Sequence, residues 1–163
     1  MNYADLLLEK NDGVAIITLN VPDKLNALTQ NMRMSLPLAI GEIAKDDGVR
    51  AVIVTGAGRG FSSGADVAAM NARERTGEPT EVPRYVRVQG AGWPFEKPSF
   101  PDLKKPVIAA INGPCVGGGF SLAMSCDIRI ASETARFGVA QVARGLVPDW
   151  SMTYFLPRTV GTS

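Results

Sequence analysis

Two stretches of apolar residues, each ending at a glycine-rich turn, constrain the fold of this chain more than any other feature. They are residues 50–55 and 107–111, each about as long as one strand. Such runs are typical of strands buried on both faces of a parallel sheet. After the second run, the glycines at 117–119 precede a predicted helix over 120–125 and a third strand over 126–131. The order strand, glycine turn, helix, strand predicts an α/β fold.

Local signals extend this prediction toward the N-terminus. Strands over 6–9 and 13–19 are joined by Asn11-Asp12-Gly13, a typical hairpin turn. Thr29 is expected to cap a helix that runs to about Lys45. Its apolar residues at helical spacing define the face that we expect to be buried: Met32, Leu36, Ile40 and Ile43.

The remaining segments carry weaker signals. Residues 71–101 are polar and rich in proline and glycine, which predicts loops with a short helix near 82–89. A fourth strand is expected over 135–139 and a final helix over 150–158. The length of the chain, 163 residues, predicts that residues 1–163 form a single domain.

Composition excludes several classes of function. A net charge of +1 with scattered basic residues predicts no nucleic-acid partner. With no long apolar run and no secretory signal over residues 1–10, we expect a cytoplasmic protein without a membrane span. The chain has no histidine, which excludes Ser-His-Asp catalysis and most zinc sites, and we expect no metal. Cys115 and Cys126 lack metal-ligand or redox spacing and are expected to be buried thiols.

The glycine turns allow three interpretations. A dinucleotide site requires G-x-G-x-x-G, but leucine takes the third glycine position in 117–122 and phenylalanine takes it in 56–61. Neither turn carries the Gly-Lys-Ser/Thr of a phosphate-binding loop. A nucleotide-binding domain is therefore the least supported of the three interpretations. The glycines either allow close packing of helix and strand, or they present two backbone N–H groups to one carbonyl oxygen as an oxyanion hole.

Several segments resemble the signature segments of the enoyl-CoA hydratase/isomerase (crotonase) family. The longest are residues 61–67 (Phe-Ser-Ser-Gly-Ala-Asp-Val) and 111–128, and 26–28, 135–138 and 145–148 also match. The resemblance implies an α/β fold of the ClpP/crotonase type, a spiral of β-β-α units with two roughly perpendicular sheets. It also implies a homo-oligomer, either trimer or hexamer, and C-terminal helices that these 163 residues do not contain.

The same resemblance implies a substrate and a site. The substrate is an acyl-CoA thioester, so coenzyme A is part of the substrate and no separate cofactor is expected. The backbone N–H groups of Ala65 and Gly118 match the family's oxyanion hole. The positions that match the segments around coenzyme A and the acyl group are Lys24, Ser63, Gly64, Asp66, Val67, Ser121 and Gln141.

Ser121 and Gln141 stand where hydratases of the family have two glutamates. A hydroxyl and an amide do not accept protons at neutral pH. Asp149 lies where isomerases of the family carry an acid, so we predict an enoyl-CoA isomerase with Asp149 as the proton acceptor. Two alternatives are a hydratase with different acid–base groups and a catalytically silent acyl-CoA-binding homologue. Asp149 can also serve only as a cap of the helix over 150–158.

Overall fold

The computed structural model describes residues 2–76, 100–148 and 150–162, without the side chains of residues 73 and 74. The predicted helix near 82–89 and Asp149 therefore lie outside the described residues. In chain order the elements are β1 (Leu6–Asn11), β2 (Val14–Leu19), the 3₁₀ helix η1 (Pro22–Lys24), α1 (Gln30–Ala44), β3 (Ala51–Gly56), α2 (Val67–Thr76), η3 (Phe100–Asp102), β4 (Val107–Ile111), β5 (Pro114–Val116), α3 (Gly118–Met124), β6 (Ile128–Ala131), β7 (Arg136–Gly138), η4 (Val142–Arg144) and α4 (Met152–Val160).

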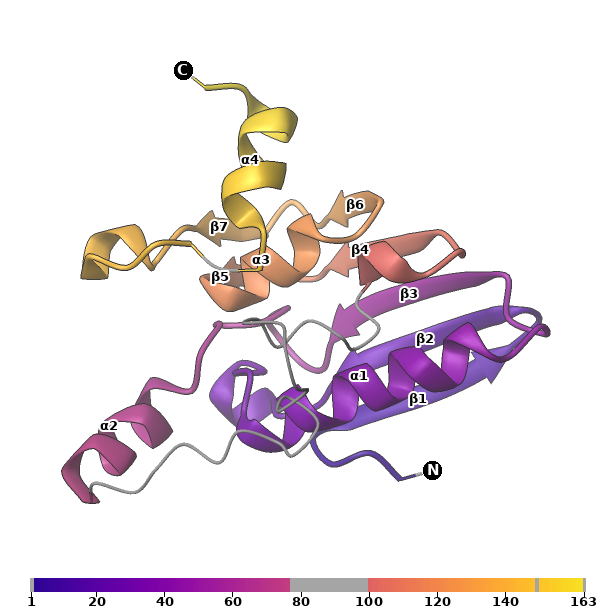
Figure 1. Ribbon diagram of the computed structural model, residues 1–163, viewed down its shortest axis with the longest axis horizontal. Coiled ribbons are helices and arrows are strands. Elements are labelled where there is room, and N and C mark those ends of the chain that lie inside the picture. The colour runs from indigo at the N-terminus through magenta and orange to yellow at the C-terminus, as the bar shows by residue number, and fades with distance from the viewer. Residues whose placement is uncertain (1, 77–99, 149, 163) are drawn as a thin grey trace, which may run out of the picture.

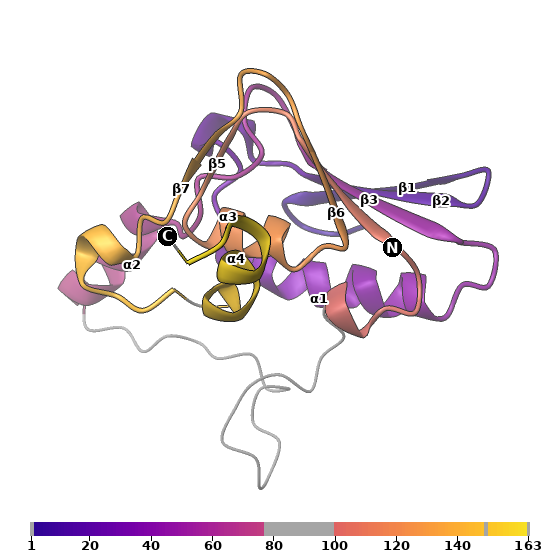
Figure 2. The same ribbon diagram turned by 90° about the horizontal axis from the view of Figure 1, so that it is seen from above.

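Two sheets organise these elements. The larger has the order β1-β2-β3-β4-β6, in which β1 and β2 form an antiparallel hairpin and the other neighbours are parallel. The smaller pairs β5 with β7 in parallel and is steeply inclined to the larger sheet (Figure 2). The predicted hairpin and the predicted parallel neighbours are thus confirmed.

Helix α1 lies along the larger sheet (Figure 1). Its N-cap is Thr29, whose hydroxyl oxygen accepts the Met32 N–H at 3.1 Å, as the sequence predicts. The predicted apolar face of α1 is buried and joins a hydrophobic core that also contains the buried side chains of β2, β3 and β4. The core positions from these four elements include Met32, Leu36, Ile40, Ile43, Ile17, Val52, Val54, Val107 and Ile111.

The prediction that β3 and β4 are buried on both faces is wrong. In both strands only alternate residues are buried, and the residues between them are partly exposed. The physical reason is that side chains alternate between the two faces of a sheet and that α1 packs on one face.

Among the described strands and α-helices, two were missed and one begins earlier than expected. We predicted residues 112–114 as a turn, but Pro114–Val116 form β5. Residues 67–76 form α2, although their polar composition gave no helical apolar stripe. Helix α3 begins at Gly118 rather than at Phe120, which places the third glycine of the turn inside the helix.

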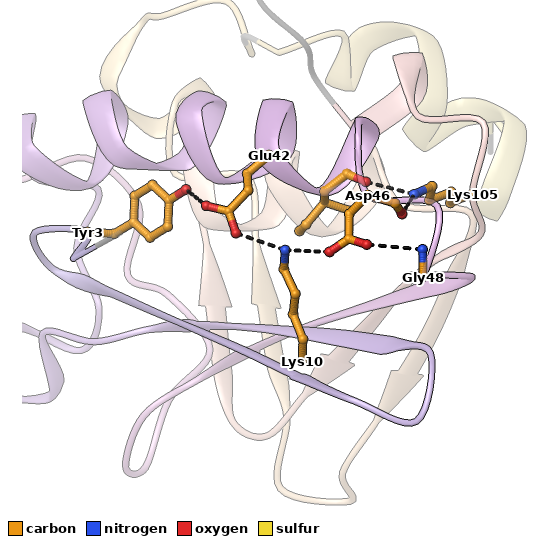
Figure 3. Close-up of polar contacts among 7 residues, drawn as sticks. Tyr3, Lys10, Glu42, Asp46, Gly48 and Lys105 are labelled. Atoms are coloured by element: carbon orange, nitrogen blue, oxygen red, sulfur yellow. Dashed lines mark hydrogen bonds and ion pairs between the residues drawn. The ribbon is translucent and has the colours of Figure 1, made fainter.

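A polar network ties the end of α1 to β1 (Figure 3). The Lys10 ammonium lies 2.8 Å from a Glu42 oxygen and 2.7 Å from an Asp46 oxygen. The Tyr3 hydroxyl donates to Glu42 at 2.6 Å, and Asp46 also accepts the Gly48 N–H at 3.0 Å. These contacts fix the helix end against the first strand.

Lys105, just before β4, completes this fixation. Its ammonium donates to the backbone oxygens of Ile43 and Asp46, which lie in and just after the last turn of α1 (Figure 3). A positive charge at a helix C-terminus satisfies carbonyl groups that have no partner in the helix and complements the helix dipole. The strand β4 is thereby tied to α1.

The network predicts a loss of stability in acid. Hydrogen bonds from Lys10 and then from Tyr3 lower the pKa of Glu42 below its ordinary value. A carboxylate with a lowered pKa stabilises the fold above its unfolded pKa, and this contribution disappears as the pH falls through the lowered value. We expect Glu42→Gln to flatten the pH dependence of the free energy of unfolding between about pH 3 and pH 5. Urea unfolding of the full-length protein measures this.

The matched control is Glu9→Gln, on the exposed part of β1. An equal flattening in both variants would contradict a specific role of the Glu42 network.

Tyr3 adds an effect on the alkaline side. Burial and then the hydrogen bond to Glu42 raise the pKa of Tyr3 to about 12. The contribution of the protonated Tyr3 hydroxyl to stability therefore persists below pH 10 and is lost as the pH rises toward 12.

Candidate functional site

Two loops far apart in the sequence run side by side at the junction of the two sheets. Pro114 O accepts the N–H groups of Phe61 and Ser62 at 3.0 and 3.1 Å, and Val116 N–H donates to Ser62 O at 2.9 Å. Ser62 and Cys115 form a parallel bridge. The loop after β3 is thus held against β5 just before the start of α3.

Beyond this bridge the loops meet at glycines. Gly64 has a left-handed φ of +85°, and a β-carbon there would lie 2.7 Å from Val116 O and 2.9 Å from the Gly118 nitrogen. A β-carbon on Gly118 would lie 4.0 Å from the Ala65 nitrogen. Only glycine allows this approach of two backbones at residue 64. The fold therefore places the backbone nitrogens of Ala65 and Gly118, the two residues named by the family resemblance, close to each other.

The electrostatics of this place follow from α3. Gly118 is the first residue of α3, so its N–H has no acceptor inside the helix. The aligned peptide dipoles place partial positive charge at this helix end. A carbonyl oxygen that gains negative charge is stabilised by such N–H groups.

Several of the expected coenzyme A positions contact one another around the loop after β3. Lys24 and Asp66 form an ion pair of 2.8 Å, and the Ser63 hydroxyl donates to Lys24 O at 3.0 Å. Asp66 also accepts the Ala69 N–H at 3.1 Å, which caps α2, and Val67 is the first residue of that helix. The hydrogen bond from Lys24 lowers the pKa of Asp66. Lys24 keeps 53% of its side chain exposed, so its positive charge remains accessible.

Ser121 and Gln141 lie near the same glycines. Ser121 is fully buried, and its hydroxyl donates to Gly117 O at 3.3 Å, one turn back along the chain. A β-carbon on Gly117 would lie 3.8 Å from the Gln141 Oε1 atom, so this amide is also next to the turn. Neither a hydroxyl nor an amide side chain is a base at neutral pH.

The structure changes the assignment of the cap of α4. The N-cap of that helix is Ser151, which follows Asp149 by two residues, and the helix begins at Met152 rather than at Trp150. Trp150 and Ser151 both have left-handed φ values, of 51° and 58°. The N-cap position that we considered for Asp149 is thus taken by another residue.

Sequence reasoning missed two buried polar residues of this region. Asn26 and Ser62 are both fully buried and connect the loop after η1 to the loop after β3. The only signal was that each lies in a segment with family resemblance. Polar residue types in loops are usually exposed, so burial could not be inferred.

Cys115 and Cys126 are free and buried, as predicted, and burial raises the pKa of both thiols to about 12. In the part of the chain that the structure describes, no three side chains of His, Cys, Asp or Glu gather as a metal site would require. Across the same described ranges, no helix has the length and apolar character of a membrane span.

Known proteins resemble this chain over nearly its whole length. Residues 9–163 match the model of the enoyl-CoA hydratase/isomerase family. The chain is 43% identical to the short-chain-enoyl-CoA hydratase of Clostridium acetobutylicum and 36% identical to the crotonyl-CoA hydratase of Syntrophomonas wolfei, in each case over 99% of this chain and 59% of the relative. It therefore spans about three fifths of the length of these curated relatives.

Solved structures agree with the sequence comparison. A probable enoyl-CoA hydratase/isomerase from Mycobacterium abscessus superposes with a TM-score of 0.80 at 36% identity, over 97% of this chain and 57% of that one. An enoyl-CoA hydratase from Mycobacterium smegmatis gives 0.76 at 37% identity, over 97% and 60%. The expected crotonase-like α/β fold is confirmed, and the chain belongs to the enoyl-CoA hydratase/isomerase family.

Proposed function

We propose that the protein carrying this chain binds an acyl-CoA thioester and holds the thioester oxygen between the N–H groups of Ala65 and Gly118. The observation that supports this most is the contact between the two glycine turns, where a β-carbon on Gly64 would lie 2.9 Å from the Gly118 nitrogen. The first turn of α3 adds the positive end of a helix dipole.

This arrangement suits reactions that pass through a thioester enolate. When a nucleophile adds to the β-carbon of a 2-enoyl thioester, or when a base removes the proton from the α-carbon, an electron pair moves onto the carbonyl oxygen. Two fixed N–H donors stabilise that charge without reorganisation, and one such donor contributes about 3 kcal/mol to the transition state.

We propose hydration of a 2-enoyl-CoA as the reaction. The curated relatives quoted above are named as hydratases, and this favours the hydratase over the isomerase that we predicted from the sequence. Water then supplies a hydroxyl group to the β-carbon and a proton to the α-carbon. Ser121 and Gln141 lie near the glycine turn and can orient the water or the acyl group.

The double-bond isomerase remains a second candidate because a specific observation favours it. The positions of the two hydratase glutamates carry a serine and a glutamine, and the buried Ser121 hydroxyl donates to Gly117 O. An isomerase needs one base that removes a proton from the α-carbon and returns it to the γ-carbon. Asp149 is the carboxylate that we propose for this role in either reaction, on the sequence alone.

Lys24 supports the identification of coenzyme A as the carrier. Its exposed ammonium lies beside the loop that holds Ala65, and it is oriented by Asp66 at 2.8 Å. A phosphate of coenzyme A would bind such an ammonium through charge-assisted hydrogen bonds. We further propose that the full-length protein assembles as a trimer or hexamer, which sedimentation equilibrium tests directly.

A substrate panel on the full-length protein tests the reaction. Formation of 3-hydroxyacyl-CoA from a 2-enoyl-CoA supports the hydratase, and conversion of a 3-enoyl-CoA into its 2-enoyl isomer supports the isomerase. A ring-epoxide thioester extends the panel to ring isomerisation. Tight binding of butyryl-CoA without any turnover would identify a silent acyl-CoA-binding homologue. Absence of binding to all four thioesters would contradict the proposal.

A further inference from the structure

Asn26 and Ser62 form a buried polar connection between the loops that surround the proposed oxyanion hole. Asn26 is fully buried, and its amide donates to Ala57 O at 2.9 Å and to Gly60 O at 2.8 Å. Its side-chain oxygen accepts the Val21 N–H at 2.9 Å. The side chain therefore fixes the loop after β3 to the loop around η1.

Ser62 extends this connection toward the hole. The Ser62 hydroxyl donates to Asn26 O at 2.7 Å. The Ser62 hydroxyl oxygen also accepts the Gly64 N–H, at 3.2 Å. A hydroxyl has one proton, so donation to Asn26 leaves its lone pairs for Gly64. The position of Gly64, one residue before Ala65, is thus linked to the backbone of Asn26.

The peptide that carries the Ala65 N–H is fixed at its other end as well. Its oxygen belongs to Gly64 and accepts the Leu28 N–H at 2.7 Å. In a trans peptide the N–H points opposite to the C=O. The Ala65 N–H is therefore directed away from the Leu28 nitrogen, and a rotation of this peptide would change the direction of this N–H.

Ser62 also contacts the other half of the hole. A β-carbon on Gly119, in the first turn of α3, would lie 2.5 Å from the Ser62 β-carbon and 2.6 Å from its hydroxyl oxygen. The serine thus contacts the first turn of the helix that carries the Gly118 N–H, and it also binds the N–H of Gly64, the residue before Ala65.

We propose that Ser62, oriented by Asn26, is a positioning residue that sets the direction of the Ala65 N–H toward the thioester oxygen. This inference rests on the proposed function, since it assumes that Ala65 and Gly118 bind that oxygen. Neither residue contacts the substrate in this proposal. Their effect passes through the Gly64–Ala65 peptide.

The test uses Ser62→Ala in the full-length protein, with Ser125→Ala as the matched control. Ser125 also donates its hydroxyl to a backbone oxygen, that of Leu122 at 2.7 Å, but at the far end of α3. Misplacement of one donor is expected to lower kcat on the order of tenfold in Ser62→Ala with little change in KM. Ser62→Cys keeps the size and a weak donor and acceptor, and is expected to recover part of the loss.

A spectroscopic measurement separates positioning from stability. The probe is butyryl-CoA labelled with ¹³C at its carbonyl, and infrared difference spectra record its C=O stretch. Binding to the wild type is expected to lower this frequency, because two N–H donors polarise the carbonyl. In Ser62→Ala the lowering is expected to shrink while the Kd changes less than about threefold.

The outcomes distinguish the two levels of the proposal. If the wild type gives no lowering, the proposed oxyanion hole is wrong. If the wild type lowers the frequency and Ser62→Ala matches it, with kcat equal to that of Ser125→Ala, the positioning role is overturned and the proposed function stands. If Ser62→Ala does not fold, Ser62→Cys decides, because a full wild-type shift in that variant overturns the inference and a reduced shift supports it.

Discussion

Replacement of Gly118 by proline is expected to lower kcat by about a hundredfold or more, because it removes one of the two proposed donors to the thioester oxygen. Gly118 is the first residue of α3, a position that proline favours, and its N–H has no acceptor inside the helix. The loss corresponds to about 3 kcal/mol of transition-state stabilisation. Steady-state kinetics on the full-length protein measure it.

Gly118→Ala is the matched control for added bulk. A β-carbon at this position would lie 3.0 Å from the Leu28 Cδ1 atom, which is the flexible end of a side chain. The alanine variant keeps the N–H and is expected to retain most of the activity. Equal turnover of the proline and alanine variants, both folded by circular dichroism, would show that the Gly118 N–H is not a donor in the reaction.

The second large effect is expected for Asp149→Asn. The chain contains no histidine, and the two positions of the hydratase glutamates carry Ser121 and Gln141. Asp149 is therefore the carboxylate that we predict to move protons, and its removal is expected to lower turnover by roughly 10² to 10⁴-fold. Asparagine keeps the shape of the side chain but cannot accept a proton. The measurement is kcat with both a 2-enoyl-CoA and a 3-enoyl-CoA.

The control for this prediction is Asp47→Asn, an exposed residue in the turn between α1 and β3. Binding of butyryl-CoA by Asp149→Asn should remain close to that of the wild type, since the oxyanion hole is intact. A variant that keeps its activity would exclude Asp149 as the proton acceptor. A variant that unfolds would assign it a structural role instead.

Local sequence signals determined much of the scaffold. The hairpin at Asp12-Gly13 and the cap at Thr29 form as predicted because both depend on contacts between residues close in the chain. The apolar run 107–111 became β4 with the predicted bounds. By contrast, the three residues of β5 are a strand because they pair with β7 and meet Ser62, and no pattern within so short a segment carries that information.

The polar helix α2 is a second element that the sequence left undetermined. It has no apolar stripe, and its start depends on Asp66, which caps it while being held by Lys24 from the loop around η1. These partners are 42 positions apart in the sequence. The sequence shows an aspartate at position 66, which is a common capping residue, but it does not show that Lys24 contacts this aspartate.

The candidate site also combines features that the sequence predicted with contacts that the sequence did not predict. The sequence showed a glycine turn at the start of a predicted helix, where N–H groups have no helical partner, and the family resemblance named Ala65 and Gly118 as the expected donors. The contact of Gly64 with this turn, and its connection to the buried residues Asn26 and Ser62, became visible only in the packed loops. The reason is physical: a hydrogen bond across 36 positions depends on how two loops pack on the sheets, and the order of residues within either loop does not specify it.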